Sequence, residues 1–213
     1  MLSTCGLTKR YHGQTVLHPA SLTLAPGEAV GIAGANGSGK STLLAILAQT
    51  LAPDSGSIEE DGRSVLGDRA FLRACVGYVP QTDSLIPELT AGEQLSLWQR
   101  LTGRPAARDR VLSDLLDLDA LRRKPIWKLS GGMRKRLSFA LALAGSPRYL
   151  IMDEAFAALD QGYRGRLEDW LRGYTAQGGA LLWCSHEPDE LQRLCTRILS
   201  LEAGRLMPLA PHA

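Results

Sequence analysis

The chain has 213 residues, of which 45% are hydrophobic and 22% charged, and its formal net charge is +2. These values are ordinary for a globular protein, and the small net charge does not favour a nucleic-acid-binding surface. The 4 cysteines form no C-x-x-C pair and have no histidines at metal-ligand spacing, so we expect free thiols. The N-terminus lacks the pattern of a signal peptide, and no run of about 18 apolar residues predicts a membrane-spanning helix.

The N-terminal part of the chain alternates short apolar runs with turn residues. We expect strands over residues 2–7, 15–17, 21–24 and 29–33, with a turn at Pro26-Gly27 before the last of them. Leucine and isoleucine at helical spacing then predict a helix over 42–51.

A glycine-rich loop lies between that last strand and the helix. Residues 34–41 read GANGSGKS and match G-x-x-x-x-G-K-[ST], the pattern of a phosphate-binding loop. Backbone N–H groups and the helix N-terminus would surround the phosphates, since glycine allows close approach. Lys40 would reach the β- and γ-phosphates, and Ser41 would hold Mg²⁺. We therefore predict a nucleotide site at Gly34, Asn36, Gly37, Ser38, Gly39, Lys40, Ser41 and Thr42.

We expect a strand at 57–60, a short helix at 68–74 and a strand at 76–79. After these elements the spacing of the apolar residues changes. From residue 82 to about 128 the apolar residues follow helical spacing. Thr90 and Glu93 read as a capping box, and a second helix is expected over 105–118 with Val111 and Leu112 on its apolar face. This stretch predicts a helical subdomain inserted into the core.

The C-terminal part returns to alternating helices and strands. We expect a helix over 130–144, a strand over 149–152, a helix near 163–174, a strand over 180–184, a helix after Pro188 and a final hairpin starting at 198–201. This alternation predicts a largely parallel sheet. The predicted fold is a single α/β domain over 1–213: a P-loop core (1–81 and 129–213), an N-terminal antiparallel β subdomain and the helical subdomain (about 82–128).

Polar residues follow three of the expected strands. Asp153 and Glu154 come at the carboxyl end of the strand at 149–152, where open α/β sheets place ligands. Asp153 could hold Mg²⁺ through water, and Glu154 could polarise an attacking water molecule. Gln81 and His186 also follow strands, and taken alone each could simply end its strand.

A second glycine pair precedes the helix at 130–144. Ser130 could cap that helix, and Gly131 and Gly132 would leave its N-terminus open to an anion. Taken alone, this pattern also fits a plain helix start.

Three motifs downstream of the phosphate loop occur together and in a familiar order. They are LSGGM at 129–133, YLIMDE at 149–154 and AALD at 157–160. With the phosphate loop, they make the chain resemble the ATP-binding cassette (ABC) ATPases over nearly its whole length. Met133, Ala155 and Ala157 depart from the common family pattern but remove no catalytic group.

The resemblance implies a role for each remaining candidate. Tyr11 would stack on adenine, and Gln81 would sense Mg²⁺ and the helical subdomain. His186 would contact the γ-phosphate and position Glu154, so that catalysis would depend on Lys40, Glu154 and His186. Two copies, identical or not, would pair head-to-tail around two ATP molecules, with contacts to the nucleotide from Ser130, Gly131, Gly132 and Asp160 of the partner.

The resemblance also implies a transporter. The chain would be a cytoplasmic ATPase subunit on the inner face of the cell membrane, joined to a separate integral membrane permease subunit. The signature variant ending in Met133 favours export over uptake. The permease would contact a groove near Gln81 lined by Leu85, Ile86, Pro87, Leu89 and Trp98, although these residues, Trp98 above all, could instead form a core of the helical subdomain.

Two other classes of protein share the phosphate-loop pattern. A soluble, non-transport ABC ATPase acting on ribosomes or DNA usually has two cassettes or a long coiled-coil insertion, and this sequence has neither. A P-loop kinase or GTPase is disfavoured because no N-K-x-D motif occurs and the LSGGM motif does. We expect no nucleic-acid partner, and the sequence does not identify the transported substrate.

Overall fold

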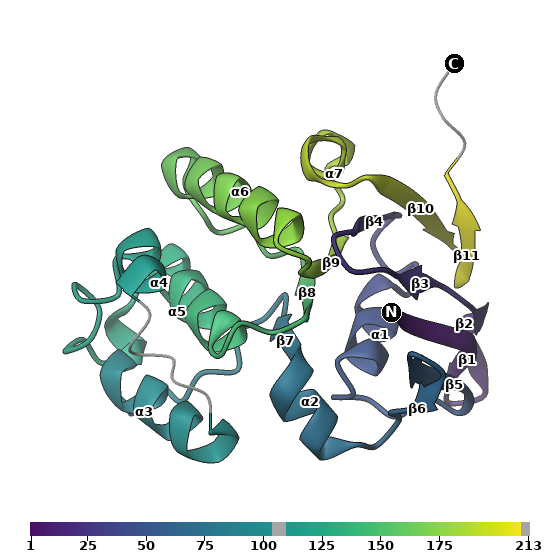
Figure 1. Ribbon diagram of the computed structural model, residues 1–213, viewed down its shortest axis with the longest axis horizontal. Helices are drawn as coiled ribbons and strands as arrows, with labels where there is room; N and C mark the ends of the chain where they lie inside the picture. Colours follow the sequence, from purple (N-terminus) through teal and green to yellow (C-terminus); the bar gives the residue numbers. More distant parts are fainter. Residues whose placement is uncertain (104–109, 210–213) are drawn as a thin grey trace.

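A largely parallel sheet forms the centre of the molecule, as predicted (Figure 1). The computed structural model describes residues 1–103 and 110–209. Five strands of this sheet run parallel, and the last strand joins it by an antiparallel hairpin. Their order is β11 (Arg205–Pro208), β10 (Arg197–Glu202), β4 (Ala29–Ala33), β9 (Ala180–Cys184), β8 (Tyr149–Asp153) and β7 (Val76–Val79).

The central strands are buried on both faces. Every residue of β8 and β9 is buried, as continuous apolar runs in a covered parallel sheet should be. Successive residues contribute to opposite cores: Leu150 and Trp183 belong to the core that includes the helical subdomain, whereas Ile151 and Leu182 belong to the core around α1 (Lys40–Leu47). The sheet therefore divides two hydrophobic cores, and its carboxyl edge lies between them.

A second, antiparallel sheet packs beside α1, which confirms the predicted N-terminal β subdomain. Its first strand continues four residues beyond the expected end, to Tyr11, because it pairs with both neighbouring strands through register shifts. The strands of this sheet are β1 (Leu2–Tyr11), β2 (Gln14–Ala20), β3 (Thr23–Leu24), β5 (Ser55–Glu60) and β6 (Arg63–Ser64).

The helical subdomain stands to one side of the two sheets in Figure 1. It contains α3 (Ala91–Thr102) and α4 (Arg110–Leu116), which pack against α5 (Gly131–Leu143). The capping box is confirmed: Thr90 Oγ1 accepts from the Glu93 amide, and Glu93 accepts from the Thr90 amide. The remaining helices are α2 (Arg69–Cys75), α6 (Gln161–Ala176), α7 (Pro188–Leu194) and a short 3-10 helix (Ile126–Lys128).

Two expected helices differ from those observed by more than two residues at one end. Helix α1 begins at Lys40 rather than residue 42 and ends at Leu47 rather than residue 51, since Gln49 takes a left-handed conformation with φ 52°. Part of the helix expected over 105–118 lies outside the described residues, and α4 ends before Asp117, whose φ is 50°. The placement of Val111 on the buried face was wrong, because it is 64% exposed.

Two other expectations concern the whole described chain. All four cysteines are free, as predicted. Across the described residues, no helix is both long and apolar enough to cross a membrane.

Candidate nucleotide site

The predicted phosphate loop connects β4 to the start of α1, and its glycines are required by its geometry. A Cβ at Gly34 would lie 2.4 Å from the carbonyl oxygen of Leu201. One at Gly39 would lie 2.9 Å from the carbonyl oxygen of Val16, and Gly39 also takes a φ of 105°. Because neither position has room for a side chain, the loop can keep its backbone amides close to a bound anion.

Lys40 places a positive charge inside this loop. The residue is 6% exposed, and its ammonium group donates to the carbonyl oxygens of Gly34 (2.7 Å) and Ala35 (3.1 Å). The Ser38 hydroxyl is buried nearby and has no hydrogen-bond partner in the described chain. A buried cation and an unpartnered hydroxyl are what a polyphosphate group would satisfy.

Asp153 ends β8 and is almost completely buried. Burial raises the pKa of its carboxyl group above the ordinary value, while a hydrogen bond from the Ser41 side chain opposes this shift. Its Oδ1 atom has no partner among the described residues. A hydroxyl next to a carboxylate with a free lone pair fits Mg²⁺, which prefers oxygen ligands.

The described residues contain no group of three or more His, Cys, Asp or Glu side chains that could enclose a metal ion.

Glu154 and His186 come together, although 32 residues separate them. Glu154 Oε2 lies 2.6 Å from Nδ1 of His186. The backbone of Glu154 takes a left-handed conformation, with φ 46°, and its amide donates to the Cys184 carbonyl. Glu154 is 8% exposed, whereas the side chain of His186 is 54% exposed, so the pair connects the sheet edge to the surface.

A polar cavity of about 270 Å³ joins the phosphate loop to this edge of the sheet. It brings together most of the predicted loop residues with Gln81 and Glu154. Val16 also lines it and was missed by the sequence analysis, since a lone valine in a short strand gives no signal of a ligand. Tyr11 is exposed and does not line it. The lining residues are Val16, Asn36, Gly37, Gly39, Lys40, Ser41, Thr42, Gln81 and Glu154.

The loop that carries Gln81 is fastened to α5 by a buried lysine. Lys135 donates to the carbonyl oxygens of Pro80 (2.8 Å) and Gln81 (3.0 Å), and its ammonium group lies 3.0 Å from Asp83. Only 4% of the Lys135 side chain is exposed. Gln81 itself is exposed, so its side chain is free to face the cavity while its backbone is held.

The second glycine motif does not reach the cavity of the same molecule. Ser130 caps α5 by accepting from the Met133 amide at 3.3 Å. Gly132 packs close to the Ala158 carbonyl, where a Cβ would lie at 2.9 Å. Asp160 caps α6 by accepting from the Tyr163 amide. None of Ser130, Gly131, Gly132 and Asp160 lines the cavity.

A family model described as "ABC transporter" matches residues 17–157, about two thirds of the chain. The chain belongs to the ABC transporter family. Among its curated relatives, this cassette is 38% identical over 209 residues to "Nod factor export ATP-binding protein I" of Ralstonia nicotianae. The alignment covers 96% of the cassette and 65% of that relative, so the chain spans less than two thirds of the relative's length.

Solved cassettes share the fold. The cassette superposes on an ATP-binding subunit of an ABC transporter with TM-score 0.88 and 27% identity, over 97% of this chain and 88% of that one. A dimeric ATP-binding cassette bound to ADP and Pi in a post-hydrolysis state matches with TM-score 0.86 and 26% identity over 100% of both chains. The predicted fold and family are therefore confirmed.

Proposed function

We propose that this cassette binds and hydrolyses ATP to power export through a separate membrane-spanning subunit. The observation that carries the proposal is the 2.6 Å contact between Glu154 and His186 beside the cavity that Lys40 lines. A carboxylate at that position can accept a proton from, or orient, the water that attacks the γ-phosphate. Family membership and the ADP- and Pi-bound structural neighbour support the same reaction.

Some residues of the site would bind the nucleotide, and others would act on the attacking water. The amides of the loop and the Lys40 ammonium group would hold the phosphates and offset the charge that develops during transfer. Glu154 would orient the water, and His186 would contact the γ-phosphate and fix the rotamer of Glu154. Tyr11, which is exposed and does not line the cavity, remains a prediction as the adenine-stacking residue.

Ser41 and Asp153 would hold Mg²⁺, with Gln81 next to them. A bound Mg²⁺ ion neutralises charge on the phosphate oxygens. The protein's own contribution is to keep a buried, unpartnered carboxylate oxygen and a hydroxyl in place for the ion.

A second ATPase subunit, identical or different, would complete the site. Ser130, Gly131, Gly132 and Asp160 lie away from the cavity of their own molecule, and a head-to-tail partner would bring such residues to the γ-phosphate. The dimeric cassette among the structural neighbours supports this arrangement. ATP would then stabilise the dimer, because it binds only the closed state fully.

An apolar cavity of about 500 Å³ between the core and the helical subdomain is the proposed contact for the permease. Leu85 and Trp98 line it, whereas Leu89 packs against the core and Ile86 is exposed. Trp98 also packs against the core. The permease would place the cassette on the inner face of the membrane, and the similarity to a Nod factor export ATP-binding protein supports export. No observation favours a ribosome- or DNA-bound role.

The proposal is tested with Glu154→Gln, which keeps the size of the side chain but removes its charge. Phosphate release should fall by about 10²–10⁴-fold, while ATP still binds and the variant accumulates as a dimer in light scattering. A variant that hydrolyses ATP at the normal rate would contradict the role of Glu154. Co-purification with an integral membrane protein tests the transporter role separately.

A further inference from the structure

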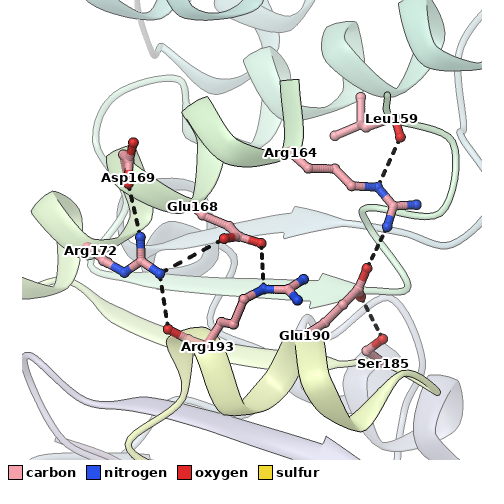
Figure 2. A network of polar contacts seen from close by, with 8 residues as sticks. All are labelled: Leu159, Arg164, Glu168, Asp169, Arg172, Ser185, Glu190 and Arg193. Carbon is pink, nitrogen blue, oxygen red and sulfur yellow. Dashed lines mark hydrogen bonds and ion pairs between the residues drawn. The ribbon is translucent and has the colours of Figure 1, made fainter. Parts of the chain in front are cut away.

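A network of polar contacts joins α6 to α7, and one half of it connects two loops of the proposed site (Figure 2). Arg164 of α6 lies at the centre of that half. Its Nε donates to the carbonyl oxygen of Leu159 at 3.0 Å, and its Nη1 donates to Glu190 Oε1 at 2.9 Å. Leu159 belongs to the AALD motif, which packs against the glycines of the signature motif.

Glu190 of α7 carries the connection to the loop of His186. It is 4% exposed, and its second oxygen accepts from the Ser185 hydroxyl at 2.8 Å. The same hydroxyl accepts from the Glu187 amide at 3.1 Å. Ser185, which precedes His186, therefore binds the Glu190 carboxylate directly, and Glu187, which follows His186, is linked to it through the Ser185 hydroxyl. Arg164 binds the other oxygen of the same carboxylate.

The other half of the network makes no such connection in the described part of the chain. Arg193 pairs with Glu168 at 3.2 Å, and Arg172 donates to Asp169 and to the Arg193 carbonyl. These contacts fasten α6 to α7 without reaching either loop, as Figure 2 shows. The two halves therefore have similar chemistry but different connections, and each can serve as a control for the other.

We propose that Arg164 and Glu190 are positioning residues for hydrolysis, which set the place of His186 relative to Glu154 and link it to the AALD loop. This inference rests on the proposed function, because it concerns the proposed role of His186. Arg164 suits the task because its planar guanidinium group donates in two directions at once, toward the Leu159 carbonyl and toward Glu190. A lysine at that position keeps the charge but cannot make both contacts in the same geometry.

The consequence is that the AALD loop and the His186 loop move together. A partner molecule that presses on the AALD loop would shift Arg164, and the shift would pass through Glu190 and Ser185 to the residues beside His186. Small displacements of this kind change rates strongly, because a misplacement of about 1 Å can cost about 10²-fold in rate.

The test compares Arg164→Lys with the matched control Arg193→Lys, using steady-state hydrolysis of Mg-ATP and thermal unfolding. For Arg164→Lys we expect kcat to fall about tenfold while KM stays within about twofold, because the group touches no substrate. For Arg193→Lys both constants should stay within about twofold. Ser185→Ala, which removes only one hydroxyl, gives a second route to the same loss of kcat if Arg164→Lys folds poorly.

A double mutant separates positioning from general stabilisation. In a His186→Ala background, Arg164→Lys should cause no further loss of kcat, since the residue it positions is gone. Equal losses in both backgrounds, or equal effects of Arg164→Lys and Arg193→Lys, would overturn the inference. If His186→Ala alone left turnover unchanged, the proposed role of His186 would fail instead, so the two failures are distinguishable.

Discussion

Helices α1 and α5 of this cassette both begin next to a glycine-rich motif that predicts anion binding, yet the surroundings of the two motifs differ. At α1, glycines are pressed against neighbouring carbonyls, a lysine is buried in the loop and a cavity of about 270 Å³ opens in front. At α5, Ser130 caps its own helix and none of the three motif residues lines that cavity. The first motif lines a cavity of its own molecule, whereas the second motif does not line that cavity.

Under the proposed function, this difference would allow ATP to act both as the substrate and as a bridge between two subunits. The phosphate loop of one molecule would bind the nucleotide. The second motif would add its backbone amides when another cassette approaches. We therefore expect damage at α1 to reduce binding by the monomer, and damage at α5 to reduce turnover alone.

Among the substitutions that test this difference between α1 and α5, Ser130→Arg should cause the largest fall in the rate of ATP hydrolysis. The added side chain would block the approach of the partner's γ-phosphate, so phosphate release should fall by at least about 10²-fold, as for the loss of a main transition-state donor. Binding of a fluorescent ATP analogue to the monomer should be unchanged. Gln177→Arg, at an exposed site near the opposite end of the central sheet, is the control, and normal turnover by Ser130→Arg would remove the second motif from the reaction.

Lys40→Ala should weaken binding by the monomer. A hydrogen bond from a charged donor contributes about 1.5–3 kcal/mol, which corresponds to about 10–100-fold in affinity. Calorimetry with ATP measures this loss, and thermal unfolding shows whether the contacts to Gly34 and Ala35 also matter for stability. Unchanged affinity in a folded variant would contradict the assignment of the phosphate loop.

A pair of glycine substitutions gives the smallest and sharpest comparison. Gly34→Ala forces a Cβ to within 2.4 Å of the Leu201 carbonyl, and overpacking of this kind costs about 1–3 kcal/mol. At about 2–4 °C for each kcal/mol, its melting temperature should fall measurably. Gly131→Ala places its Cβ 3.8 Å from Ala158, an ordinary contact, so it should melt within about 2–4 °C of the wild type, the shift that helix propensity alone allows.

Turnover separates the same two substitutions. Gly131→Ala should reduce phosphate release by about tenfold despite its normal stability, because it adds a methyl group at the N-terminus of α5, where the proposed partner's γ-phosphate would approach. Equal melting temperatures for the two variants would show that the loop is not as tightly packed as the distances indicate.

The phosphate loop and the Asp153-Glu154 pair could be predicted from the sequence because their signals are local. Spacing, glycine content and position at a strand end are all visible within a few residues. The same holds for the α/β fold, since periodicity shows the alternation of helices and strands.

Contacts between distant segments could not be predicted in this way. Val16 enters the cavity only because the antiparallel sheet packs against Gly39, a contact with no sequence signal. Lys135 and Arg164 lie on helices, where charged residues are usually solvated, and only the packing of other elements buries or pairs them. The boundary of α1 also depended on the left-handed conformation of Gln49.

The left-handed backbone of Glu154 has a consequence for heat resistance. A non-glycine residue in this conformation costs about 1–2 kcal/mol, and the fold accepts that cost at the residue whose side chain is proposed to orient the attacking water. A glycine at position 154 would remove the conformational strain of the backbone and would also remove the carboxylate. The demands of stability and of the proposed chemistry therefore oppose each other at this one residue, since stability alone would favour glycine there.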